Sequence, residues 1–251
     1  MSGRDEYYNK AKQQGYRSRS AYKLQQLDDT ADLIASGDTV IDLGAAPGGW
    51  LQVAAERTDD GRVVGVDRQR IESIDGVETV RGDLTEDDTQ AELAERVGEA
   101  DLVLSDMAPN MTGEYDLDHA RSVHLARQAL DVARTVLAPG GDLVVKVFDG
   151  RDLDDLEADI EDEFEYVRTV RPEASRDESS ELYLVGKGRM TAPVETGDEL
   201  SVEITDTGDE GDGIAKVEEY TLFVSGAEEG ETVRVRIEDV KPRFGFAERI
   251  D

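Results

Sequence analysis

Between residues 39 and 185, short apolar runs rich in β-branched residues alternate with amphipathic stretches. Apolar runs of this kind are typical of strands buried on both faces of a sheet, and helices between successive strands make such a sheet mostly parallel. The pattern therefore predicts a doubly wound α/β domain. The expected strands are 39–43, 62–67, 78–81, 101–105, 142–148, 164–170 and 181–185, and the expected helices are 50–57, 90–97, 117–137 and 153–163.

After residue 189 the pattern changes to short strands that follow one another through glycine-rich and acidic turns. No helix fits between them, so a small closed or half-closed antiparallel β-barrel of OB-like size is expected. The chain is thus predicted to comprise a basic N-terminal arm or helix (1–27), the α/β domain (28–189) and the barrel (190–251). The barrel strands are expected at 200–205, 214–217, 220–224, 232–238 and 244–250.

The chain is strongly acidic, with 59 acidic and 28 basic side chains and a formal net charge of −31. These acids are spread among well-patterned apolar segments, which suits a folded protein in concentrated salt, where at about 1 M the Debye length is only about 3 Å. We therefore expect a halophile's protein. Residues 1–27 are the exception, with six basic and two acidic side chains and four tyrosines, and are either a contact for a polyanion or a solvated helical N-terminus.

Several classes of protein are excluded by what the sequence lacks. The absence of cysteine removes disulfides, thiolate nucleophiles, iron–sulfur clusters and cysteine-ligated zinc. His119 and His124 are five residues apart and do not share a helix face, so no metal site is expected. No apolar run approaches the roughly 20 residues that cross a bilayer, and the N-terminus lacks a signal peptide's apolar segment, so a soluble, cytoplasmic protein is expected.

The first expected strand runs into a glycine-rich loop, DLGAAPGGW at residues 42–50. A loop at this place is where an open α/β sheet accepts a nucleotide. The glycine spacing does not fit the G-x-G-x-x-G pattern of dinucleotide sites, and Pro47 has no N–H to offer a pyrophosphate. Packing of helix against sheet explains Gly44 but not the whole loop.

Carboxylates follow three of the expected strands: Asp67, Asp83 and Asp106. Asp67 is placed to bind ribose hydroxyls, which NAD and S-adenosylmethionine both carry. A crevice lined by carboxylates suits a cationic sulfonium ligand and repels a pyrophosphate. S-adenosylmethionine is therefore the favoured ligand, while a dehydrogenase stays open on fold alone.

Lys146 lies in the middle of an apolar run, LVVKVF at residues 143–148. Lysine is almost never fully buried unless it is paired, and an isolated ammonium is strongly disfavoured there. A functional role is favoured over the alternative, a structural lysine that emerges at a strand end.

Four motifs occur in order along the chain: RSRSAYKL, DLGAAPGGW, SDMAPN and VVKVF. Together they resemble the FtsJ/RrmJ (RlmE) family of RNA ribose 2′-O-methyltransferases, from about residue 17 to residue 188. The resemblance implies a Rossmann-like, S-adenosylmethionine-dependent methyltransferase domain without a metal. It implies a catalytic tetrad of Lys23, Asp106, Lys146 and Glu181, and cofactor contacts at Gly48, Trp50, Asp67, Asp83 and Asp106.

The role of each implied residue stays open at this point. Lys146 either removes the proton of the ribose 2′-hydroxyl or orients that hydroxyl while the proton leaves late. Lys23 and Glu181 are, without the resemblance, ordinary surface residues. Trp50, the sole tryptophan, is equally a core residue.

Residues 190–251 resemble a TRAM domain, a small β-barrel often attached to RNA-modifying enzymes, through the stretches 200–216 and 233–246. The alternative is a plain packed barrel without RNA contacts, which the acidity of this segment keeps open. A fused barrel departs from the bacterial pattern of the family and indicates an archaeal-type enzyme. The candidate RNA contacts are Lys216, Lys241, Arg243, Phe244 and Phe246.

The function that the resemblance implies is methylation of the ribose 2′-hydroxyl of a uridine in large-subunit (23S) rRNA, within a ribosomal subunit or its precursor. The same chemistry on tRNA is one alternative. A non-catalytic RNA-binding assembly factor with a relict cofactor pocket is the other, and the four matching tetrad residues argue against it. Neither DNA nor a membrane is expected as a partner.

Overall fold

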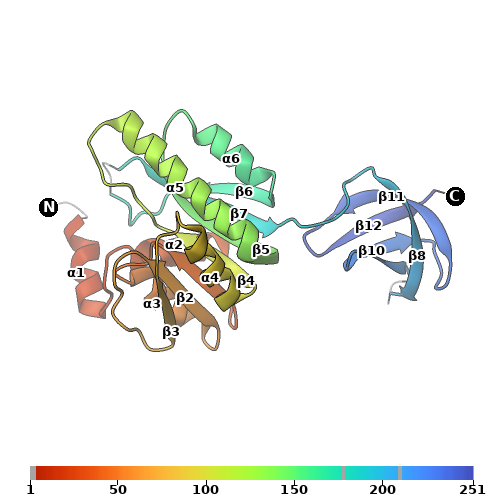
Figure 1. Cartoon of the computed structure of the whole chain (residues 1–251), viewed down its shortest axis with the longest axis horizontal. Coiled ribbons are helices and arrows are strands. Elements are labelled where there is room, and N and C mark those ends of the chain that lie inside the picture. Colours follow the sequence, from red (N-terminus) through yellow and green to blue (C-terminus); the bar gives the residue numbers. More distant parts are fainter. Residues whose placement is uncertain (1–3, 177–178, 209–210, 251) are drawn as a thin grey trace. The chain divides into compact units, whose positions relative to one another are not determined.

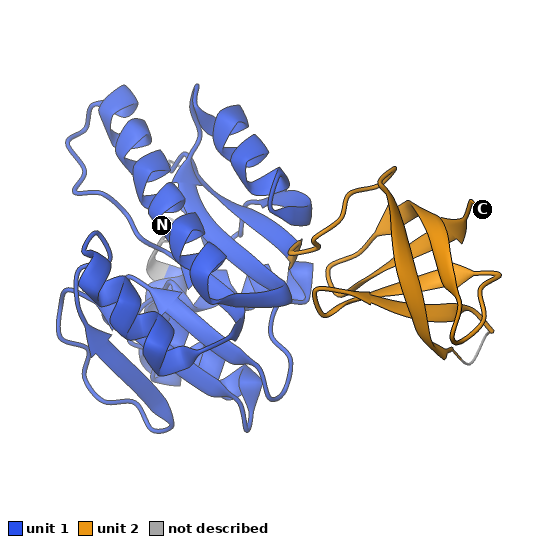
Figure 2. Cartoon of the chain, turned by 45° about the vertical axis from the view of Figure 1, so that its right-hand side comes forward, with its two compact units in different colours: residues 1–187 blue, residues 188–251 orange. Residues whose placement is uncertain are grey.

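The computed structural model describes residues 4–176, 179–208 and 211–250. The chain divides into two compact units, residues 1–187 and residues 188–251 (Figure 2). Among the described residues, none of the helices has both the length and the apolar character that crossing a bilayer requires.

Unit 1 is built on a seven-stranded sheet with the order β3-β2-β1-β4-β5-β7-β6 (Figure 1). The strands from β3 to β5 run parallel to their neighbours, and β7 is antiparallel to β5. The predicted doubly wound, mostly parallel α/β domain is therefore confirmed. The strands are β1 (Thr39–Leu43), β2 (Arg62–Asp67), β3 (Val77–Arg81), β4 (Ala100–Ser105), β5 (Leu137–Phe148), β6 (Phe164–Val170) and β7 (Glu181–Arg189).

Helices cover both faces of this sheet because successive strand residues point to opposite sides. On β1, Ile41 and Leu43 belong to one apolar core, which also contains residues of α4, α5 and α6. Val40 belongs to the other core, with α2 and α3. The helices are α1 (Arg4–Gln14), α2 (Ala21–Ala31), α3 (Gly49–Thr58), α4 (Asp87–Val97), α5 (Tyr115–Val136) and α6 (Leu153–Glu161).

Unit 2 is a closed barrel of five strands in the order β10-β12-β11-β8-β9, as predicted for a small OB-like barrel. Its neighbouring strands are antiparallel as predicted, except that β10 and β12 run parallel. Its apolar core is formed by residues of unit 2 alone, and Val235, Leu222 and Val224 are wholly buried in it. The bounds of the strands lie close to the predicted ones. They are β8 (Glu199–Thr207), β9 (Gly213–Val217), β10 (Tyr220–Ser225), β11 (Thr232–Val240) and β12 (Phe244–Arg249).

Candidate active site

A cavity of about 380 Å³ lies at the carboxyl ends of the parallel strands of unit 1. Three of the residues that line it are carboxylates: Asp67 at the end of β2, Asp83 after β3 and Asp106 after β4. Parallel strands end at the same edge of a sheet, which is why residues far apart in the sequence meet there. The three acids identified from the sequence therefore line one cavity.

The glycine-rich loop forms another wall of this cavity through Gly44 and Ala46. Gly44 has a φ of 76°, and a Cβ atom there would lie 2.4 Å from Cγ of Met107, so the loop needs a glycine at this point. Asp67 Oδ2 accepts a hydrogen bond from the Ala46 backbone N–H at 2.9 Å, which fixes the loop against β2.

Gly48 and Trp50, the other two predicted cofactor contacts, do not line the cavity. Gly48 precedes α3 with a φ of 108°. Trp50 is 2% exposed, and its Nε1 donates a hydrogen bond to the Ser20 carbonyl at 2.8 Å. Its ring packs against that of Tyr183 with the centroids 5.8 Å apart. Contacts of Gly48 and Trp50 with a cofactor stay a prediction.

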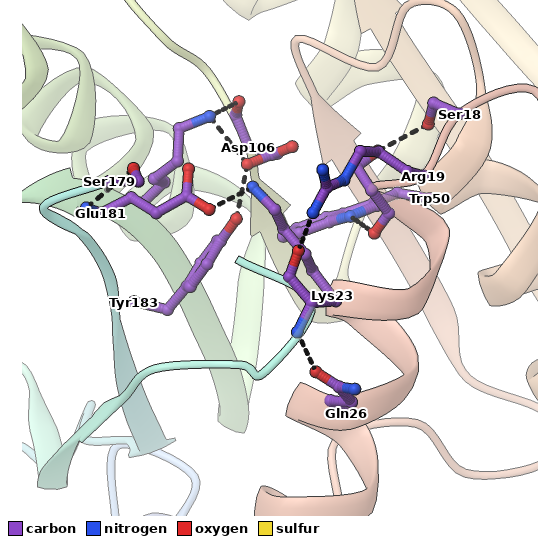
Figure 3. Close-up of polar contacts among 12 residues, drawn as sticks. Ser18, Arg19, Lys23, Gln26, Trp50, Asp106, Ser179, Glu181 and Tyr183 are labelled. Carbon is purple, nitrogen blue, oxygen red and sulfur yellow. Dashed lines mark hydrogen bonds and ion pairs between the residues drawn. The ribbon is translucent and has the colours of Figure 1, made fainter. Parts of the chain in front are cut away.

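The four predicted tetrad residues form two adjacent ion pairs (Figure 3). Lys146 Nζ, on β5, donates to Asp106 Oδ1 at 2.8 Å and also to the Asp106 carbonyl. Lys23 Nζ, on α2, lies 2.5 Å from Glu181 Oε1 on β7. Lys23, Lys146 and Glu181 are each less than a tenth exposed. Burial of both lysines is therefore compensated by carboxylates.

Tyr183 connects these two pairs, and the sequence analysis missed it. Its hydroxyl donates to Asp106 Oδ1 at 2.7 Å, and Lys23 Nζ lies 5.9 Å from its ring centroid. Tyr183 stands opposite Lys146 in the sheet register. Because side chains on a strand alternate, Tyr183 shares a face with Glu181, and this spacing is the signal that identifies it.

Contacts outside the tetrad hold α2 in place, and thereby Lys23. The Arg19 guanidinium donates to the Ala174 carbonyl at 2.6 Å, and the Ala174 N–H donates to Gln26 Oε1 at 2.8 Å. Together with the bond from Trp50 to Ser20, these contacts join α2 to α3 and to the segment between β6 and β7. Lys23 is therefore held in place within the folded protein and is not an exposed surface lysine.

The charges in the site keep Asp106 ionised. Burial alone would raise the pKa of Asp106, but the charges of Lys146 and Lys23 and the hydrogen bonds from Lys146 and Tyr183 outweigh burial, and the pKa lies below its ordinary value. Burial, followed by the charges of Asp106 and Glu181, raises the pKa of Tyr183 well above its ordinary value. Tyr183 therefore remains a hydrogen-bond donor at neutral pH.

A second buried acid, Asp42 on β1, has no compensation of this kind. It is 1% exposed, and neither carboxyl oxygen has a hydrogen-bond partner among the described residues. Burial, and then the charges of Asp106 and Asp67, raises the pKa of Asp42 well above its ordinary value. Both neighbouring acids line the cavity, so the raised pKa of Asp42 reflects the negative potential of the cavity as well as burial.

We expect Asp42 to make the folded protein less stable as the pH rises. The folded protein binds this proton more tightly than the unfolded chain, so above the ordinary pKa of 3.8 stability falls by about 1.4 kcal/mol for each pH unit until the raised pKa is passed. Asp42→Asn removes this dependence. The free energies of unfolding of the wild type and Asp42→Asn, measured with urea at constant salt, should differ by an amount that grows with pH. A difference that does not change with pH would contradict this expectation.

The described residues contain no group of three or more histidine, cysteine, aspartate or glutamate side chains able to hold a metal ion. His119 is 2% exposed and already bonded: Nδ1 lies 2.8 Å from the Phe148 carbonyl, and Nε2 accepts from the Asp152 N–H at 3.1 Å. It therefore belongs to the packing between α5 and β5.

The sheet order, with an antiparallel strand between β5 and β6, and the acidic cavity at the strand ends together define a Rossmann-like methyltransferase domain. Comparison with family models identifies it further. Residues 16–189 match the FtsJ-like methyltransferase model, and residues 193–250 match the TRAM domain model. The chain belongs to the FtsJ-like methyltransferase family, which confirms the family predicted from the four motifs.

Relatives with high identity span the whole chain. A protein of Natronomonas pharaonis named ribosomal RNA large subunit methyltransferase E is 69% identical, with both chains covered completely. A protein of Methanocella arvoryzae with the same name is 50% identical, covering 99% of this chain and 97% of its own. A crystal structure from Plasmodium falciparum, provisionally named a ribosomal RNA methyltransferase, superposes with a TM-score of 0.63 at 30% identity, covering 69% of this chain and 98% of the other.

Proposed function

We propose that this protein methylates the ribose 2′-hydroxyl of a uridine in large-subunit (23S) rRNA, with S-adenosylmethionine as the methyl donor. The observation that carries the proposal is the position of Asp106. Its side chain holds Lys146 and also lines the acidic cavity, so the donor site and the amine share one residue. The names of the full-length relatives support ribosomal RNA as the substrate.

The cavity fits S-adenosylmethionine by the chemistry of its donor set. Asp67 has the position of an acid that binds ribose hydroxyls. Hydrogen bonds from the backbone and side chain of Thr85 lower the pKa of Asp83, so a second ionised acceptor faces the space. When bound, S-adenosylmethionine supplies an electrophilic methyl group on a cationic sulfonium. A cation offsets the repulsion among the acids around the cavity.

Lys146 orients the ribose hydroxyl in this proposal. Its nitrogen donates two hydrogens to Asp106, which leaves a third N–H for the 2′-oxygen. A nitrogen that donates in this way fixes the direction of the oxygen lone pairs and stabilises the alkoxide character that develops as the hydroxyl proton passes to solvent water. Lys23 and Glu181 form the adjoining ion pair, and the charge of Lys23 helps to keep Asp106 ionised.

The barrel offers aromatic side chains for contact with RNA. Phe223, Phe244 and Phe246 lie with ring centroids 5.6 to 5.8 Å apart, and Phe244 and Phe246 are 37% and 42% exposed. In concentrated salt, attraction to phosphates is weak, so stacking on bases gains importance. We include Lys216, Lys241 and Arg243, which follow or lie within strands of the same barrel, in this proposed RNA contact.

A ribosomal subunit or its precursor is the proposed form of the substrate, and the cytoplasm the proposed place of action, because ribosomal RNA is found there. Methylation of tRNA is the competing activity. We expect tritiated S-adenosylmethionine, offered in concentrated KCl with total rRNA, tRNA and large subunits, to label a single 2′-oxygen in 23S rRNA. Label on tRNA alone, or on no RNA, would overturn the assignment, and Lys146→Ala supplies the blank.

A further inference from the structure

A second cavity, of about 240 Å³, opens at the same edge of the sheet as the tetrad. It shares no lining residue with the larger, acidic cavity. Five of its lining residues come from three segments: Met111 and Tyr115 before and at the start of α5, Phe148 at the end of β5, and Ser179 and Ser180 before β7.

Two of these segments also carry a tetrad residue. Phe148 follows Lys146 by two positions on β5, so both side chains project to the same side of that strand. Ser180 directly precedes Glu181, and Glu181 stands opposite Phe148 in the sheet register. Figure 3 shows Ser179 beside Glu181, whose backbone N–H donates to the Ser179 hydroxyl at 3.2 Å. The second cavity is therefore lined in part by residues that are one or two positions from tetrad residues in the chain.

The lining of the second cavity suits a flat, uncharged group. No lysine or arginine is among its described lining residues, so it offers nothing to a phosphate. Met111 and Tyr115 are 63% and 57% exposed and provide apolar surface at its rim. The Tyr115 hydroxyl donates to the Asp149 carbonyl at 2.5 Å, which holds the ring in place. Asp118 is already bonded to backbone N–H groups of Thr112 and Gly113.

We propose that this second cavity receives the base of the nucleotide that is methylated, with the ring of Tyr115 stacked against that base. The inference rests on the proposed function. The base and the 2′-hydroxyl are attached to adjacent carbons of one ribose, so a hydroxyl at Lys146 places the base within a few ångströms of the tetrad. Specific recognition of RNA commonly takes an unstacked base into such an aromatic-walled recess. Ligand pockets for drug-sized molecules begin near 300 Å³, so a smaller cavity suits a single base.

The first test is the kinetics of Tyr115→Ala on the mapped rRNA fragment. Loss of a stacking partner should raise KM for RNA by about 5- to 100-fold. The dissociation constant for S-adenosylmethionine should not change, because Tyr115 does not line the acidic cavity. Tyr115→Phe keeps the ring and should retain most of the affinity. Tyr166→Ala, which removes a tyrosine that is 51% exposed on β6, is the matched control and should match the wild type.

The second test locates the base directly. A rRNA fragment with 5-iodouridine at the mapped position is irradiated in complex with the full chain, and the crosslinked peptide is identified. A crosslink to the segment 111–119 or to Phe148 supports the proposal. A crosslink in the acidic cavity or in the barrel would overturn it, as would an unchanged KM for Tyr115→Ala. If the wild type methylates no RNA at all, the proposed function has failed instead.

Discussion

Lys146→Ala is expected to lower the rate of methyl transfer by about 10²- to 10⁴-fold, the range typical for loss of a group that manages a proton at a reacting oxygen. The residue is placed for this role by burial on β5 and by its two bonds to Asp106. Single-turnover transfer from labelled S-adenosylmethionine measures the loss. Affinity for the donor should remain near that of the wild type, because Lys146 does not line the acidic cavity.

Lys146→Arg separates the two roles considered for this amine. A guanidinium stays protonated and donates hydrogen bonds, so it can orient a hydroxyl but cannot accept its proton. We expect this variant to transfer methyl groups clearly faster than Lys146→Ala. Equal, background rates for the two variants, with circular dichroism showing both folded, would point to a general base instead of an orienting donor.

Asp106→Asn should impair the protein in two ways at once, because Asp106 contacts both Lys146 and the acidic cavity. Removing one partner of a buried ion pair costs about 3–5 kcal/mol of the free energy of unfolding. We also expect methyl transfer to fall by more than about a hundredfold and the affinity for S-adenosylmethionine to fall as well. Titration calorimetry, unfolding curves and single-turnover kinetics measure the three effects.

Asp83→Asn is the matched control for Asp106→Asn. Asp83 lines the same cavity, but its bonds go to Thr85 and Arg68 and not to the tetrad. It should weaken donor binding while leaving the rate at saturating donor close to that of the wild type. Equal losses of that rate in both variants would contradict the role given to Asp106 as the residue shared by the cavity and the tetrad.

The stability that Asp106 contributes should depend on pH in the opposite sense to Asp42. Its pKa is lowered in the folded protein, so its contribution is fully present above the ordinary value of 3.8 and is lost as the pH falls through the folded value. The difference in unfolding free energy between the wild type and Asp106→Asn should accordingly shrink in acid.

Most of the fold follows from local sequence patterns. β1 and β2 have the predicted bounds because each is a short, mostly apolar run with a clear end: Gly44, whose φ is positive, follows β1, and β2 ends at Asp67. β5 begins at Leu137 instead of residue 142, since the Pro-Gly-Gly stretch ends α5 but then continues as extended chain, with Leu137 paired to Ala100. A Pro-Gly-Gly stretch by itself does not show whether the chain makes a turn after the helix or continues as part of the next strand.

The site was predictable only in part, and the reason is physical. Lys146 is conspicuous because a charge interrupts an apolar run, but the pair of Lys23 and Glu181 joins residues that no local pattern connects. The matching family motifs were needed to identify these two. Asp42 interrupts the run TVIDL in the same way as Lys146 interrupts its own, so the same rule would have found it.

The central claim is that the Lys146 amine meets a ribose hydroxyl. A crystal structure of the full chain with S-adenosylhomocysteine and an rRNA fragment containing the mapped nucleotide tests this directly. We expect Lys146 Nζ within about 3.2 Å of the 2′-oxygen, the reach of a hydrogen bond. A 2′-oxygen held elsewhere, with the Lys146 amine still bonded only to Asp106, would contradict the claim.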